Sequence, residues 1–287
     1  VAAVVPVLAG MWSDPAVGYQ IAMAIMSAVG VIMFLFCYFN TTEHVAHKVD
    51  HQPLLRQFVL LLKNSQWLIL LAVCVTGTIG YVIRGSVAIY YAKYYLGGND
   101  TVVSAFISTG VVAAILSMVA STWITKFYCK IKLFRYTQLL VGVLSLMIYF
   151  LVGRDDIILA FALYFLLSFV VDLHAPVFWS IISETIDYGQ VKNSQRVSGF
   201  AYGGISVGQK IGMGIAGYMV GWLLTHFNYV PNAEQSDYSL VGIALMLSII
   251  PGVFHTIMGL LMFMYRINDT YYGQIKEEMR IKGYIAN

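Results

Sequence analysis

Residues 199–226 read GFAYGGISVGQKIGMGIAGYMVGWLLTH. The stretch is long enough to cross a bilayer as a helix, and Lys210 lies near its middle, ~16 Å from the cytoplasmic end assigned below. A cation at that depth costs at least ~2.5–3.5 kcal/mol on insertion scales, so such residues usually face a cavity or a partner. We therefore interpret Lys210 as a functional residue, with a structural ion pair as the alternative.

The helix face that carries Lys210 is small and polar. Helical spacing places on it Gly203, Ser206, Gly214, Gly217 and Gly221. Small-residue stripes are common where membrane helices pack closely, so we expect these glycines to be packing contacts. The alternative is that they let a substrate approach the backbone.

The composition identifies an integral membrane protein. The 287 residues are 59% hydrophobic and 11% charged, whereas soluble domains carry about 25% charged residues. The apolar runs are ~20 residues long without period-two alternation, which predicts helices rather than a β-barrel. The three cysteines, Cys37, Cys74 and Cys129, match no metal or redox spacing.

The basic residues define the orientation. With four exceptions (Arg84, Lys93, Arg154 and Lys210), every lysine and arginine falls in segments 40–64, 126–135, 184–198 and 266–287. The positive-inside rule places these segments in the cytoplasm. The predicted spans between them cover residues 18–39, 66–96, 101–125, 136–152, 157–183, 199–226 and 240–265.

The predicted organisation follows from these spans. Residues 1–39 hold the end of one helix and a full span, 40–64 form a cytoplasmic linker, 65–265 form a six-helix bundle, and 266–287 form a cytoplasmic tail. Within the bundle, Arg84, Asp172 and Lys210 lie well inside their spans. A bundle with one polar interior and some lipid-facing helices would have this pattern.

Several short motifs carry a family resemblance. They are Glu184-Thr-Ile-Asp-Tyr-Gly189, Lys192 and Arg196, Gln209-Lys210, Arg84-Gly85, Tyr90-Tyr91 and Lys93-Tyr94. Together they resemble the loop and eleventh helix, and the seventh helix, of the glycoside–pentoside–hexuronide:cation symporters, the family of the melibiose permease. The resemblance covers essentially the whole chain.

The resemblance implies a major-facilitator fold with two six-helix bundles around a central cavity. This chain would supply the C-terminal bundle and the last helices of the N-terminal one. It implies sugar or glycoside symport with Na⁺ or H⁺ in a bacterial inner membrane. Lys210 matches a family lysine implicated in sugar and cation binding. The family's cation site is formed mainly by acidic residues of the first bundle, so we expect a partner bundle that precedes Val1.

A sugar site needs polar hydrogen-bonding groups and aromatic rings. The candidates are Lys210, Gln209, Asp172, Arg84, Trp179, Tyr90, Tyr91 and Tyr202. Asp172 and Lys210 are at similar depth, so we hypothesise that they approach within ion-pair or one-water distance in at least one state. Asp172 as a structural hydrogen-bond partner and Arg84 as a structural clamp are the alternatives.

The cytoplasmic segment after residue 183 predicts a gate. Glu184 and Asp187 are three residues apart and share a helix face, and with Lys192 and Arg196 they suit an ionic lock between bundles. The alternative is a solvated loop. His174 and His255 lie in apolar spans and are interpreted as core histidines, with proton coupling by His174 as the alternative. Pro176 is expected to kink its helix.

These observations predict a secondary sugar:cation symporter that works by alternating access. We expect no catalytic residue, no metal site and no cofactor beyond the coupling cation. Walker and zinc motifs are absent from the sequence, which argues against an enzyme. A non-transporting membrane sensor or scaffold with the same fold is the alternative, and nothing in the sequence indicates a nucleic-acid partner.

Overall fold

The computed structural model describes residues 11–12, 14–41 and 53–284, which are helical apart from turns and short loops. The chain divides into two units, residues 1–51 and 52–287. The first unit contains α2 (Pro15–Asn40), which begins where the Asp14 carboxylate accepts a hydrogen bond from the amide of Ala16 at 2.9 Å. Apolar side chains are exposed along nearly all of α2 within this unit.

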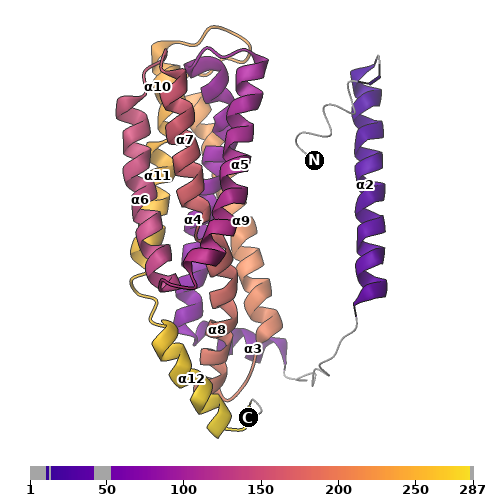
Figure 1. Cartoon of the computed structure of the whole chain (residues 1–287), viewed down its shortest axis with the longest axis vertical. Coiled ribbons are helices and arrows are strands. Elements are labelled where there is room, and N and C mark those ends of the chain that lie inside the picture. The colour runs from indigo at the N-terminus through magenta and orange to yellow at the C-terminus, as the bar shows by residue number, and fades with distance from the viewer. Residues whose placement is uncertain (1–10, 13, 42–52, 285–287) are drawn as a thin grey trace. The chain divides into compact units, whose positions relative to one another are not determined.

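The second unit is a bundle of long helices with shorter ones at one end (Figure 1). Its elements are α3 (Leu54–Leu62), α4 (Ser65–Tyr90), the π-helical turn η1 (Tyr91–Tyr95), α5 (Asp100–Ile124), α6 (Lys130–Leu151), α7 (Ile157–Asp172), α8 (Ala175–Asn193), α9 (Ser198–His226), α10 (Asp237–Leu247), α11 (Ile249–Leu261) and α12 (Asp269–Ile281). The all-helical fold predicted from the sequence is therefore confirmed.

Among the described residues, six helical stretches are long and apolar enough to cross a membrane: α2, α4 with η1, α5, α6, α7 with α8, and α10 with α11. The predicted span at 199–226 forms α9, which has 29 residues but is not among the six. Its glycines, Gln209 and Lys210 lower its hydropathy. It packs against the apolar α4, and its membrane span stays a prediction.

Glycines bring α9 against α4. A Cβ on Gly212 would lie 3.0 Å from the backbone oxygen of Val75 and 3.0 Å from Cβ of Thr78. Gly204 and Gly208 face Trp67 and Leu71 of α4 in the same way, one helical turn apart. Such close approach of two helices requires residues without side chains.

Within this unit, other glycines than those of the Lys210 face make the close helix contacts. Gly203, Gly214, Gly217 and Gly221 have no other heavy atom of the described residues near a built Cβ. The glycine row that packs within this unit lies on another side of α9, at positions 204, 208 and 212. The Lys210 face is instead the open face of α9 in this unit.

Three boundaries differ from the sequence prediction. The helix α8 continues through the predicted loop to Asn193 and ends at Ser194, which has a positive φ of 55°. The predicted linker 40–64 contains α3, and its residues 42–52 lie outside the described residues. The predicted tail contains α12, which packs on α8.

The buried core is split into two apolar clusters along the bundle. On α4, one cluster ends at Cys74 and the other begins at Ile79. On α6 the change falls between Phe134 and Val141, and on α9 it falls between Ile205 and Ala216. The same division on several helices defines a middle layer, which contains the polar side chains of Gln138, Asp172, Gln209 and His255.

Candidate functional site

A cavity of about 220 Å³ lies in the middle layer between α4, α8, α9 and α11. Its lining includes Thr78, Tyr81, Asp172, Trp179, Gln209 and His255. The structure thus brings together three residues that the sequence predicted for substrate binding, namely Asp172, Trp179 and Gln209. They come from three different helical segments, so the cavity depends on the packing of the whole bundle.

Asp172 is positioned by a helix break. It ends α7, and α8 begins at Ala175 with Pro176 in its first turn. Carbonyls freed at the break are paired inside the bundle: Ser121 Oγ donates to the oxygen of Leu173 at 2.7 Å, and Gln138 Nε2 donates to that of Val171 at 3.3 Å. A broken helix at membrane depth is tolerated where its free backbone groups are satisfied and a cavity is lined.

Arg84 is buried and paired on α4. Its Nε donates to the carbonyl oxygen of Leu247 at 3.2 Å, and its Nη2 donates to Ser145 Oγ at 3.1 Å. These contacts fit the clamp interpretation of Arg84. The residue also lines a second cavity of about 370 Å³ together with Tyr81 and Asp172. Asp172 therefore lies at the border of two cavities, one of them beside a guanidinium.

Lys210 lies on the open side of α9. Its side chain is exposed and lines a surface hollow with Ser206, Val207 and Ile211. Within residues 53–284, no ion pair joins Lys210 to Asp172. The hypothesised approach of these two residues is not seen in this conformation and stays a prediction for another state.

The predicted tyrosines lie away from the cavity. Tyr91 is 1% exposed and packs in the apolar core against Phe106, so it is a core residue rather than a wall of a site. Tyr90 belongs to an aromatic cluster with Tyr94 and Tyr229. The ring centroids of Tyr90 and Tyr229 are 5.2 Å apart. Tyr202 is exposed on α9 and does not line the cavity of Asp172.

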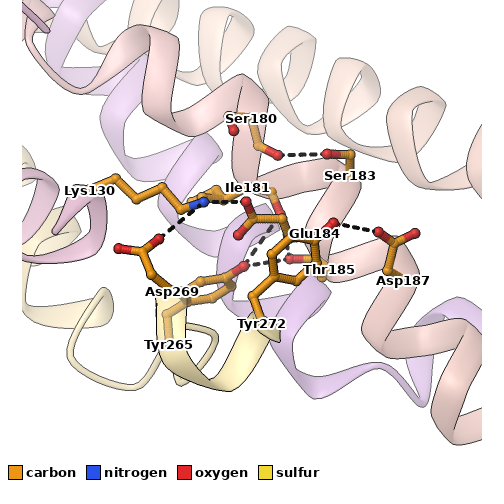
Figure 2. A network of polar contacts seen from close by, with 10 residues as sticks. All are labelled: Lys130, Ser180, Ile181, Ser183, Glu184, Thr185, Asp187, Tyr265, Asp269 and Tyr272. Carbon is orange, nitrogen blue, oxygen red and sulfur yellow. Dashed lines mark hydrogen bonds and ion pairs between the residues drawn. The ribbon is translucent and has the colours of Figure 1, made fainter. Parts of the chain in front are cut away.

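A polar network joins α6, α8 and α12 at the cytoplasmic end (Figure 2). Lys130 forms an ion pair with the buried carboxylate of Glu184, and its Nζ also lies 3.4 Å from Asp269 Oδ1. The second carboxylate oxygen of Glu184 is buried without a hydrogen-bond partner in the described residues. The predicted gate residue Glu184 is therefore paired with Lys130, rather than with Lys192 or Arg196.

Asp187 is the centre of a second polar group. It accepts a hydrogen bond from Arg196 Nη1 at 2.6 Å and another from the Tyr272 hydroxyl at 2.7 Å. Burial, followed by the hydrogen bond to Asp187, raises the pKa of Tyr272, so the phenol stays a donor at neutral pH. Lys192 lies over the ring of Tyr188 at 5.8 Å.

The sequence interpretation missed the partners on the tail. The network around the predicted gate residues includes Lys130, Asp269 and Tyr272. Lys130 lies in the predicted loop 126–135, and Asp269 and Tyr272 lie in the predicted tail 266–287. The orientation rule did place their segments on the same membrane side as Glu184, which was the available signal. The predicted lock between bundles stays a prediction, because every pair described above lies within the second unit.

Comparisons with known proteins agree with this architecture. A family model described as MFS/sugar transport protein matches residues 1–269. The chain is 28% identical over 268 residues to the "Putative glycoside/cation symporter YagG" of Escherichia coli, covering 93% of this chain and 58% of that protein. It is 27% identical to the Inner membrane symporter YicJ of the same organism, over 82% of this chain and 51% of that one. The chain thus spans little more than half the length of these relatives.

A solved structure has the same fold. The transporter FucP, of the Major Facilitator Superfamily (MFS) and in the outward conformation, superposes with a TM-score of 0.60. The sequences are 15% identical, and the match covers 88% of this chain and 55% of that one. This likeness supports the arrangement of helices that surrounds the cavity of Asp172.

Proposed function

Because the chain belongs to the MFS/sugar transport protein family and is a multi-pass membrane protein, not an enzyme, we propose that it transports a sugar or glycoside. In this proposal the solute crosses together with a coupling cation, Na⁺ or H⁺, by alternating access. The similarity to glycoside/cation symporters supports the class of solute. The chain spans 58% and 51% of the length of two of those relatives, so transport by a whole protein of this kind is part of the proposal.

The observation that carries the proposal is the polar layer between two apolar cores. A broken helix at Asp172, a cavity beside Gln209 and Trp179, and a cation on the open face of α9 all lie at this level. Ionisable groups inside membrane bundles usually mark solute or ion pathways. Hydroxyls of a sugar can pair with the amide and the carboxylate, and its apolar ring face can lie on an indole.

Gating would use the cytoplasmic network. In alternating access, the end of the cavity that faces the cytoplasm must open and close in each cycle. Glu184, Asp187, Lys192 and Arg196 lie at that end of α8 and in the turn after it. Ion pairs there can exchange partners between states, whereas an apolar seal would have to repack.

Uptake assays on the complete reading frame test this function. Labelled sugars and glycosides are offered to membrane vesicles with an imposed Na⁺ or H⁺ gradient, and with no gradient. The proposal predicts gradient-driven accumulation of at least one of them. Binding without accumulation under any gradient would favour the sensor interpretation and contradict transport.

A further inference from the structure

His255, on α11, has one ring nitrogen without a partner. Its side chain is 1% exposed, and it lines the cavity that also holds Asp172 and Gln209. Its Nδ1 lies 2.9 Å from Gln138 Oε1, whereas Nε2 has no hydrogen-bond partner in residues 53–284. A buried polar atom that is left unpaired costs free energy, so a native structure that keeps one needs a reason.

The neighbours of His255 determine its tautomer. The amide nitrogen of Gln138 donates to the carbonyl oxygen of Val171, which can only accept. The amide oxygen of Gln138 therefore faces His255, and Nδ1 must carry the proton that this oxygen accepts. In a neutral ring Nε2 then holds a lone pair with no donor among residues 53–284, on a side chain that lines the cavity.

The surroundings of the ring favour this neutral form. No carboxylate of the described residues forms an ion pair with His255. A second cation buried near Arg84 without a partner would be costly, because isolated charges are strongly disfavoured in apolar interiors. His255 is thus held as a fixed acceptor, oriented through Gln138, and not as a carrier of the coupling proton.

We propose that His255 Nε2 accepts a hydrogen bond from one hydroxyl of a polyhydroxylated solute bound in this cavity. The inference rests on the proposed transport function and deepens it by assigning a specificity-determining residue. At roughly 30 Å³ per water, the cavity of about 220 Å³ has more room than one bridging water needs. Gln209 and Asp172 offer the solute further polar contacts, and Trp179 offers an aromatic face.

The matched variants are His255→Asn and His255→Gln. The asparagine amide nitrogen can replace Nδ1 and keep the bond to Gln138, but it places no acceptor where Nε2 lies. The glutamine amide oxygen reaches the position of Nε2. His226→Gln, at the outer end of α9, controls for a general effect of losing a histidine, since His226 is exposed and contacts Tyr238.

The experiment measures KM for uptake of the transported sugar and its monodeoxy analogues by the complete protein in vesicles. His255→Asn is expected to raise KM roughly threefold to tenfold, the range of one hydrogen bond, whereas His255→Gln changes it less. One deoxy analogue should bind the wild type more weakly by the same factor and be insensitive to His255→Asn. The analogue that shows both effects identifies the hydroxyl from which Nε2 accepts a hydrogen bond.

Two results would overturn the proposal. One is an unchanged KM in His255→Asn while the wild type transports, which would mean that the cavity holds only water. The other is an equal loss for the parent sugar and every analogue. If the asparagine variant fails to fold, ¹⁵N-histidine spectra of the wild type decide: the shift of the unprotonated Nε2 must move when sugar is added, and an unmoved signal refutes the contact. A wild type that accumulates no sugar contradicts the proposed function itself, which is a different outcome.

Discussion

Arg84 on α4 donates a hydrogen bond through Nε to the carbonyl oxygen of Leu247, the last residue of α10, at 3.2 Å. In a continuous helix this oxygen would accept from the amide of residue 251, but that residue is Pro251 and has no amide hydrogen. The guanidinium thus takes the place of a missing helical bond. The break between α10 and α11 and the buried arginine form one structural unit.

Replacing Arg84 should destabilise the bundle in a way that depends on Pro251. Arg84→Met leaves the Leu247 oxygen and the Ser145 hydroxyl without this donor, at a cost of about 2–3 kcal/mol. In a Pro251→Ala background the new amide can pair with Leu247, so the same change should cost about 1 kcal/mol less. Unfolding in mixed micelles measures both losses.

The control for this double-mutant cycle of Arg84 and Pro251 is Arg154→Met. Arg154 forms an exposed ion pair with Asp237, so its loss should cost no more than about 1 kcal/mol. Equal losses for Arg84→Met with and without Pro251 would show that the arginine does not compensate for the proline.

Two neighbouring glycines of α9 should respond oppositely to alanine. Gly212→Ala places a Cβ 3.0 Å from the backbone oxygen of Val75, which has little room to move, so we expect a loss of about 1–3 kcal/mol. Gly214→Ala meets no described atom and should gain up to about 1 kcal/mol of helix propensity. Thermal unfolding of the purified variants tests the difference, and equal shifts would contradict the close packing of α9 on α4.

Removing Lys130 should leave a buried carboxylate without its cation. Lys130→Met is expected to cost about 3 kcal/mol, because Glu184 is 5% exposed and, among the described residues, only Lys130 lies within ion-pair distance of it. Adding Glu184→Gln should recover part of that loss. Asp269→Asn, whose carboxylate is largely exposed, should cost less than about 1 kcal/mol. Comparable losses for the three variants would argue against a buried pair.

Charge reversal at Asp187 should alter transport rate more than substrate affinity. Asp187→Arg breaks the contacts to Arg196 and Tyr272 at the predicted cytoplasmic end. Asp187 lies about two helical turns along α8 from Trp179, which lines the cavity. We expect maximal uptake to fall about tenfold with KM nearly unchanged, and the added Arg196→Asp to restore part of the rate. Glu278→Gln, in an exposed pair with Lys282, is the control.

A change in KM that exceeds the change in maximal uptake would contradict a gate at Asp187. Failure of the double exchange to restore any rate, with both proteins folded, would show that the residues do not act as a pair.

The sequence predicted the helices because apolar runs and the distribution of basic residues depend on the bilayer alone. A kink at Pro176 was predicted, and the structure has a break between Asp172 and Ala175. Charge within apolar runs drew attention to Arg84 and Asp172, which line a cavity inside the bundle, and to Lys210, whose membrane depth stays a prediction. These features are local, and a single sequence is enough to reveal them.

Pairings across the bundle were less predictable. Whether Glu184 meets Lys130 or Arg196 depends on the rotation of α8 and on the docking of α12, which no local pattern encodes. The glycine row that packs on α4 was not predictable for the same reason, because several faces of α9 are rich in glycine. The sequence predicted an ordinary core histidine at position 255. Only the structure shows that its Nδ1 is hydrogen-bonded to Gln138 and its Nε2 is not.

Accessibility of position 210 to a water-borne reagent tests the central claim most directly. The complete protein, with Cys37, Cys74 and Cys129 replaced by serine, carries Lys210→Cys or, as a control, Val119→Cys on the exposed apolar face of α5. A charged, membrane-impermeant thiol reagent should label position 210 much faster than position 119, and transported sugar should slow the labelling. Equal, slow labelling at both positions would place residue 210 against lipid and contradict a solute pathway at this layer.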